Sequence, residues 1–182
     1  MSSKKHYVIT SITLGAIAAA SALLIGGTNL LTRGQIAKNE KNKISSGISE
    51  IFGKSASVSS EFEVKDQKYT NYAYEISVAE NPSKAYAFRT TGSNMYGKIS
   101  LLVGFYESSE ASNPSFAGLS IVVNEQTYAT TLVENYIDPV NADSRDLDDV
   151  SCGATYGAKL VRDMVNDAKG VASKLIGEKN NG

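Results

Sequence analysis

A long stretch without charge near the start of the chain most constrains what this sequence can fold into. Residues 6–32 contain no Asp, Glu, Lys or Arg, and they lie between Lys5 and Arg33. About 20 apolar residues in a helix are enough to cross a bilayer. The stretch therefore predicts an N-terminal transmembrane helix, with residues 1–33 as a membrane anchor and residues 34–182 as the domain that it carries.

A cleaved signal peptide is the alternative interpretation of this stretch. Lys4 and Lys5 precede it, and Ala20-Ser21-Ala22 is similar to a cleavage site. The uncharged run continues past that site, so we expect the helix to be retained. More Lys and Arg follow the stretch than precede it, so the charges alone do not place the N-terminus inside the cell.

The composition restricts the chemistry of the chain. The formal net charge is -1, which provides no electrostatic basis for binding nucleic acid. A single cysteine, Cys152, excludes an intramolecular disulfide and a cysteine-bound iron–sulfur cluster, and a single histidine, His6, disfavours metal and general-base chemistry. Any redox chemistry would therefore depend on an organic cofactor.

The apolar pattern after the uncharged stretch predicts one α+β domain with a mainly antiparallel sheet. Apolar residues at helical spacing predict a helix up to Phe52, ended by Gly53, and a C-terminal helix with one apolar stripe from Leu160 to Leu175. Short alternating segments predict half-buried strands, and longer apolar runs are typical of central strands. The alternating segments are 62–64, 72–78 and 86–88, separated by turns that include 81–83; the longer runs are 99–106 and 117–123, with a polar turn at 107–114.

The segment DVSCGAT, residues 149–155, places the hydroxyl of Thr155 behind two small residues at the start of the C-terminal helix. Unpaired N–H groups and the helix dipole favour a phosphate at such a position. Gly153 and Ala154 would let a phosphate approach the backbone closely. The alternative is that Thr155 or Ser151 only caps the helix.

Five aspartates gather in residues 138–149, just before the end of this acidic region meets the Gly-Ala-Thr sequence. Their spacing lacks the pattern and the glycine of a calcium-binding EF-hand loop. We therefore expect a solvated acidic loop and no metal site.

DVSCGAT resembles the flavinylation motif D-x-x-(S/T)-G-A-T, whose final Thr receives FMN through a phosphoester bond made by a flavin transferase. Cys152 stands where that motif has Ser or Thr. The segments SNMYGKISLLVGFY and FAGLSIVVNEQTYATTL resemble the central part of the FMN-binding domain family, with residues 126–129 in place of its E-T-P-G-like turn.

Taken in order, these parts resemble the small flavoprotein subunit of the Rnf ferredoxin:NAD oxidoreductase and its relative, the flavoprotein subunit of the sodium-pumping NADH:quinone reductase. The resemblance implies a membrane-anchored redox subunit of an ion-translocating complex, which relays electrons through covalent FMN and is not catalytically autonomous. It also implies other membrane subunits as partners, a flavin transferase during maturation, and a domain on the extracytoplasmic side of the cell membrane.

Candidate site residues follow from the resemblance. Cofactor-binding candidates are Thr155, Ala154, Gly153, Cys152, Thr127 and Tyr96, and Asp149 is the candidate for recognition by the transferase. We expect Cys152 to be a small packing residue and not a redox thiol, and we expect the ten tyrosines to pack in the core and on the sheet, not to stack on a flavin.

Two other functions remain open from the sequence. The chain could be a stand-alone flavinylated electron carrier on the extracellular face. It could also be an anchored binding or assembly module without a cofactor.

Overall fold

The structure is a computed structural model that describes residues 2–79, 81–108 and 113–180. The chain divides into two compact units, residues 1–42 and 43–182. A single long helix, α1 (Ser2–Phe52), makes up the described part of the first unit and contributes its last residues to the second. The division of the chain into an anchor of residues 1–33 and a domain of residues 34–182 remains a prediction.

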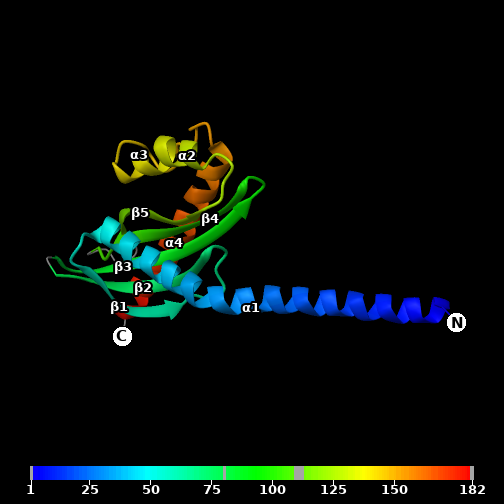
Figure 1. The fold of residues 1–182 in the computed structure, drawn as a ribbon. Coiled ribbons are helices and arrows are strands. Elements are labelled where there is room, and N and C mark those ends of the chain that lie inside the picture. Colours follow the sequence, from blue (N-terminus) through cyan, green and yellow to red (C-terminus); the bar gives the residue numbers. More distant parts are fainter. Residues whose placement is uncertain (1, 80, 109–112, 181–182) are drawn as a thin grey trace. The chain divides into compact units, whose positions relative to one another are not determined.

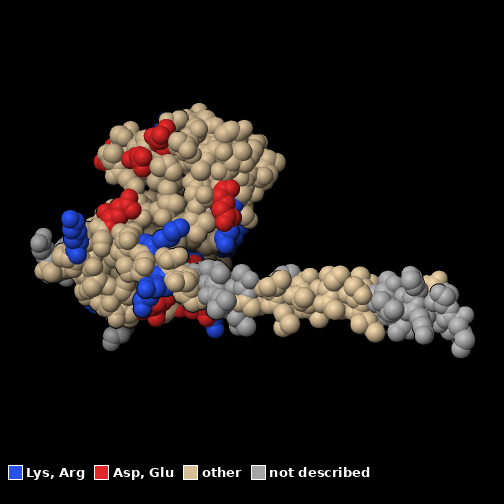
Figure 2. All heavy atoms as spheres, viewed as in Figure 1, with Lys and Arg blue, Asp and Glu red and all other residues tan. Residues whose placement is uncertain are grey.

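The first unit is helical, as expected for the uncharged stretch. Residues 11–24 are all exposed and carry no charged side chain (Figure 2). A membrane-spanning helix was predicted over residues 6–32; within the described part of the chain, no helix is both long and apolar enough to cross a membrane.

The second unit is built on one antiparallel sheet of five strands in the order β1-β2-β3-β4-β5, which confirms the predicted α+β class (Figure 1). Each strand pairs with the strand that follows it in the sequence. The strands are β1 (Ala56–Glu63), β2 (Thr70–Val78), β3 (Asn81–Asn94), β4 (Gly97–Tyr106) and β5 (Ser115–Asn124).

Helical segments follow the sheet. After β5 come the short helix α2 (Ala129–Leu132), a π-helical segment η1 (Val133–Ile137) and α3 (Asp138–Asn141). The long C-terminal helix α4 (Thr155–Asn180) completes the chain. The end of α1 lies in front of the sheet in Figure 1 and α4 lies behind it, so helices cover both faces.

The face covered by α4 has a core of large side chains. Tyr86 and Phe88 of β3 and Phe105 of β4 are fully buried there, and the rings of Phe88 and Phe105 meet edge to face at 6.0 Å. The predicted stripe of α4 is buried against them: Leu160, Val161, Met164, Val165, Ala168, Val171 and Ala172 are all buried, and Leu175 is half-buried.

The face covered by α1 is packed differently, with small side chains in the strands. Ile48 and Phe52 of α1 are buried against Ala85 and Ala87 of β3. A Cβ added at Gly104 of β4 would lie 2.8 Å from the Phe52 ring, so this glycine allows the helix to approach closely. The helix ends at Phe52, where Gly53 adopts φ +91°, as predicted.

Three expectations about the second unit were wrong. Tyr86 and Phe88 lie in a strand buried on both faces, not half-buried, because helices cover the sheet on both sides. Residues 81–83 open β3 rather than forming a turn, and β5 is an edge strand rather than a central one. The acidic segment begins in a helix, since Asp138 starts α3. Residues 109–112 of the expected polar turn lie outside the described residues.

Candidate functional site

A pocket of about 320 Å³ opens where the start of α4 meets the turn after β5 and the hairpin between β3 and β4. Small-molecule sites commonly begin at about this size. Three tyrosines, a buried amide side chain, a leucine and the small residues of the 153–157 segment form its wall. The lining residues are Tyr96, Gln126, Tyr128, Leu132, Gly153, Ala154, Thr155, Tyr156 and Gly157.

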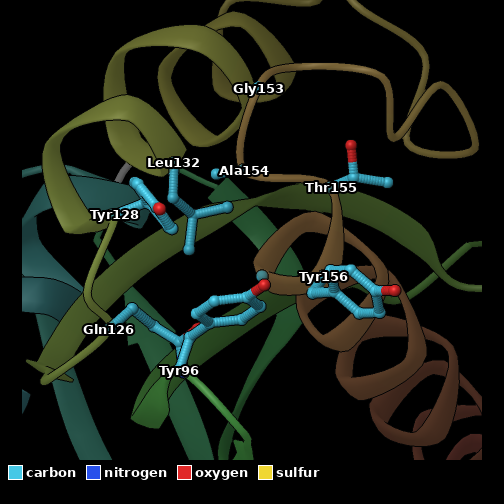
Figure 3. A pocket seen from close by; sticks show the side chains of 9 residues that line it. Tyr96, Gln126, Tyr128, Leu132, Gly153, Ala154, Thr155 and Tyr156 are labelled. Atoms are coloured by element: carbon cyan, nitrogen blue, oxygen red, sulfur yellow. The ribbon is translucent and has the colours of Figure 1, made fainter.

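Thr155 is the first residue of α4 and is half-buried on this wall. Among the described residues, none forms a hydrogen bond with its hydroxyl, nor with that of Ser151, so neither side chain caps the helix. Figure 3 shows the Thr155 hydroxyl directed away from the rings of Tyr96 and Tyr156. The capping interpretation of the motif therefore does not account for Thr155.

The two residues before Thr155 leave little room for larger side chains. Gly153 has φ +84°, in the left-handed region that favours glycine, and a Cβ there would lie 3.3 Å from Thr131 Cγ2. Ala154 is only 7% exposed. Its carbonyl accepts the hydrogen bond from Ala158 N at 3.0 Å that closes the first turn of α4, which leaves the earlier N–H groups of this turn without helical partners.

Aromatic side chains form the other wall of the pocket. The ring of Tyr96 lies between those of Tyr128 and Tyr156, at 5.6 Å from each centroid (Figure 3). Tyr128 and Tyr156 are 52% and 59% exposed. Asn94 holds this arrangement, since its Nδ2 donates to the carbonyl of Tyr156 at 3.1 Å and its Oδ1 accepts from Tyr96 N at 2.8 Å.

The turn after β5 contributes Gln126, which is only 6% exposed. Its Nε2 donates to the carbonyl of Gly97. Gly97 has φ +131°, and a Cβ there would collide with the carbonyl of Glu125, so this position requires glycine. Next in the turn, Thr127 uses its backbone N–H and its hydroxyl to bind the carbonyl of Tyr96, at 2.8 and 3.1 Å.

Asp149 lies in an exposed loop before the pocket. Arg145 Nη1 is 3.6 Å from Asp149 Oδ2 and also donates to the carbonyls of Asp149 and Ser151, at 3.1 and 3.2 Å. Ser151 N donates to Asp149 Oδ1 at 3.3 Å. Asp149 therefore shapes this loop, and it does not reach the pocket wall.

Close to this loop, Tyr136 of η1 is fully buried and donates its hydroxyl to the carbonyl of Leu147. Removal of the phenol from water disfavours its charged form, so burial raises the pKa of Tyr136 above its ordinary value. Acidic side chains gather over α2 and α3 (Figure 2). Within the described ranges, however, no group of three or more His, Cys, Asp and Glu side chains could hold a metal ion.

The structure brings together four of the candidate site residues, Thr155, Ala154, Gly153 and Tyr96. Thr127 and Cys152 do not belong to the described pocket wall. The Thr127 hydroxyl is used by the hairpin, and Cys152 is 7% exposed in the core, where Asn135 donates to its carbonyl at 3.3 Å.

Sequence reasoning missed five residues of the wall: Gln126, Tyr128, Leu132, Tyr156 and Gly157. The packing role expected of the tyrosines is confirmed for Tyr74, Tyr86 and Tyr136, which are buried, but three others line the pocket. One available signal was that these three lie outside the alternating pattern of the strands, in turns or beside Thr155. A buried Gln at the pocket had no such signal.

The residues present suit a ligand that combines a phosphate with a flat aromatic ring. The free N–H groups at the start of α4 suit the phosphate, and the tyrosines offer planar contacts to the ring. The fold and the site thus define an α+β domain with a pocket at a helix start.

A comparison with known families assigns the N-terminal part of the chain. Residues 1–51 match the family model described as the RnfG N-terminal region. The predicted resemblance to the flavoprotein subunit of the Rnf complex, an electron-transport complex, is confirmed over this region; the match does not extend to the pocket. No curated protein matches the chain.

Proposed function

We propose that this chain is the flavoprotein subunit of an Rnf-type ion-translocating ferredoxin:NAD oxidoreductase complex, and that it relays electrons through FMN attached to Thr155 by a phosphoester bond. The observation that carries this proposal is the half-buried hydroxyl of Thr155, which has no hydrogen-bond partner among the described residues and lies on the wall of the pocket. The match of residues 1–51 to the RnfG N-terminal region supports the assignment to this complex.

The residues around Thr155 fit FMN in two ways. The first turn of α4 offers N–H groups and the positive end of the helix dipole to the phosphate. Gly153 and Ala154 keep side-chain bulk away from that position. Tyr96, Tyr128 and Tyr156 would hold the isoalloxazine ring, which supplies reversible acceptance of electrons.

The uncharged stretch of residues 6–32 would anchor the subunit in the cell membrane, with the sheet domain on the extracytoplasmic side. Anchoring keeps the carrier near the other membrane subunits of the complex and raises its effective concentration without new contacts. Covalent attachment would also prevent loss of the cofactor outside the cytoplasm.

Attachment requires a flavin transferase that can reach Thr155. The reaction joins Thr155 Oγ1 to the phosphorus of FMN and removes the hydroxyl proton, so the chain gains the mass of FMN less one water. Asp149 lies in an exposed loop that Arg145 braces, and we propose this loop as the part that the transferase recognises.

The test is denaturing electrophoresis of protein produced together with a flavin transferase, viewed by flavin fluorescence. We expect a fluorescent band from the wild type and from Thr130→Ala, a matched control in α2 whose side chain is exposed. We expect none from Thr155→Ala. A fluorescent band that persists in Thr155→Ala, or a bare Thr155 in the wild type, would contradict the proposal.

The same preparation separates the alternatives. If extraction in mild detergent recovers a flavinylated chain only as a monomer, it acts as a stand-alone carrier and not as a subunit. If the intact mass shows no added FMN despite an active transferase, the chain is a binding or assembly module.

A further inference from the structure

The side chain of Gln126 is the most buried polar side chain on the pocket wall, with 6% of its surface exposed. Its backbone is held on both sides, because Gln126 N donates to Asn124 Oδ1 at 3.1 Å and its carbonyl accepts from Ala129 N at 3.1 Å. A buried amide in a braced turn loses little further freedom when it binds a ligand.

The direction of this amide is set by chemistry. The carbonyl of Gly97 can only accept a hydrogen bond, so the group of Gln126 that faces it must be the NH₂ group. The backbone of Gly97 cannot move easily, because a side chain at this position would collide with Glu125. The amide oxygen Oε1 is therefore turned away from the hairpin.

That oxygen is an acceptor without a donor. A Cβ at Gly157, which also lines the pocket, would lie 3.5 Å from Oε1, so the oxygen faces the start of α4. Among the described residues, none donates a hydrogen bond to it, and it is not one of the fully enclosed unpaired atoms. An acceptor that remains accessible at a pocket wall is suited to a ligand N–H.

We infer that Gln126 is the residue that recognises the flavin ring, with Oε1 accepting the imide N–H at the pyrimidine edge of the isoalloxazine. The inference rests on the proposed function, and it extends that function from attachment at Thr155 to recognition of the ring. The tyrosines accept any flat ring. The amide oxygen adds a requirement for an N–H group at one edge.

The first experiment needs no variant of the chain. Full-length protein produced without a transferase, in mild detergent, is titrated with lumiflavin and with N3-methyllumiflavin, and flavin fluorescence is followed. We expect lumiflavin to bind about tenfold more tightly, the ratio for a hydrogen bond worth about 1.4 kcal/mol. Equal affinity for the two rings, or no binding of lumiflavin, overturns the inference.

The second experiment separates loss of the hydrogen bond from simple crowding by the methyl group. Gln126→Leu is expected to bind lumiflavin about tenfold more weakly and to bind both rings equally, since it has no acceptor. Gln67→Leu, the same change in the loop between β1 and β2, is expected to keep the wild-type preference. A preference that persists in Gln126→Leu overturns the inference.

The outcomes distinguish this inference from the proposed function. A fluorescent Thr155 band together with equal binding of the two rings rejects only the role of Gln126. A ring preference together with a bare Thr155 in the presence of a transferase rejects covalent attachment.

Discussion

The two faces of the sheet are packed by different means, although the same strands supply both. The face toward α4 carries large side chains, and the face toward α1 carries very small ones. The first includes Tyr86, Phe88 and Phe105, and the second includes Ala85, Ala87 and Gly104. Large side chains build a thick core, whereas small ones let the backbone of a helix approach the strands.

This difference explains where the pocket lies. On the α1 face, a Cβ at Gly47 would lie 2.8 Å from Leu102 Cδ1 and from Ser120 Oγ, so the helix and the strands leave no free volume there. On the α4 face, the helix stands off the sheet on its large side chains, and the pocket opens at its first turn. Substitutions on the two faces should therefore change stability by different mechanisms.

The largest effect is expected from Phe88→Ala, which removes a fully buried ring from the α4 face. The free energy of unfolding should fall by about 3–5 kcal/mol, because the change loses buried apolar surface and leaves a cavity. Urea denaturation followed by circular dichroism measures it. Phe116→Ala is the matched control, since this ring is 39% exposed; an equal loss in both would contradict a thick core.

The next effect is expected from Gly104→Ala on the α1 face. The added methyl group would lie 2.8 Å from Phe52 Cζ, so the free energy of unfolding should fall by about 2–3 kcal/mol through overpacking. Gly170→Ala in α4 meets no atom within 4 Å and should instead stabilise the chain slightly. Thermal unfolding of both variants decides. If Gly104→Ala unfolds at the wild-type temperature, the close approach of α1 is not a constraint.

A smaller effect is expected where α4 is joined to the sheet by one carboxylate. Asp167 Oδ2 accepts from Tyr69 N, Thr70 N and Thr70 Oγ1, at 3.2, 2.9 and 2.7 Å. Asp167→Ala should lower the free energy of unfolding by about 2 kcal/mol, because it leaves these donors without their partner.

The control for this prediction is Asp163→Ala on the same helix, which loses only an exposed ion pair with Arg162 and should change stability by less than about 1 kcal/mol. Chemical denaturation compares the two. Similar losses would show that α4 is held by its apolar stripe alone.

The smallest effect is a fall in stability at alkaline pH, with one buried tyrosine on each face. Burial raises the pKa of Tyr136 on the α4 face and of Tyr74 on the α1 face, where the charge of Glu61 adds to the shift. Above the unfolded pKa of about 10, the folded chain keeps protons that the unfolded chain loses, so the free energy of unfolding falls as pH rises.

By pH 11 this loss should reach about 1 kcal/mol for each tyrosine. Tyr74→Phe and Tyr136→Phe should each remove part of the slope between pH 9 and 11, as measured by urea denaturation at each pH. An unchanged slope in Tyr136→Phe would show that water reaches this phenol in the folded chain.

Much of the fold could be predicted from local pattern. The apolar stripe of α4 and the end of α1 at Gly53 follow from helical spacing and from the glycine that ends a helix. The strands were located because apolar runs and turn residues alternate along 56–124. The candidate site was predicted as far as it lies in one continuous segment, residues 153–155.

The rest of the site could not be predicted, since it is assembled from segments distant in the sequence. Tyr96 comes from a hairpin, Gln126 and Tyr128 from the turn after β5, and Tyr156 from α4. Burial of Gln126 depends on Gly97, which is far from it in the sequence. No local pattern records such a pairing.

The sequence by itself determined which segments become helix or strand and where a reactive hydroxyl stands at a helix start, because spacing and local chemistry act over a few residues. Only the tertiary structure decided that both faces of the sheet are covered, that β5 is an edge, and that an amide and three tyrosines surround Thr155. These features depend on contacts between elements, whose geometry arises only when the whole chain is packed.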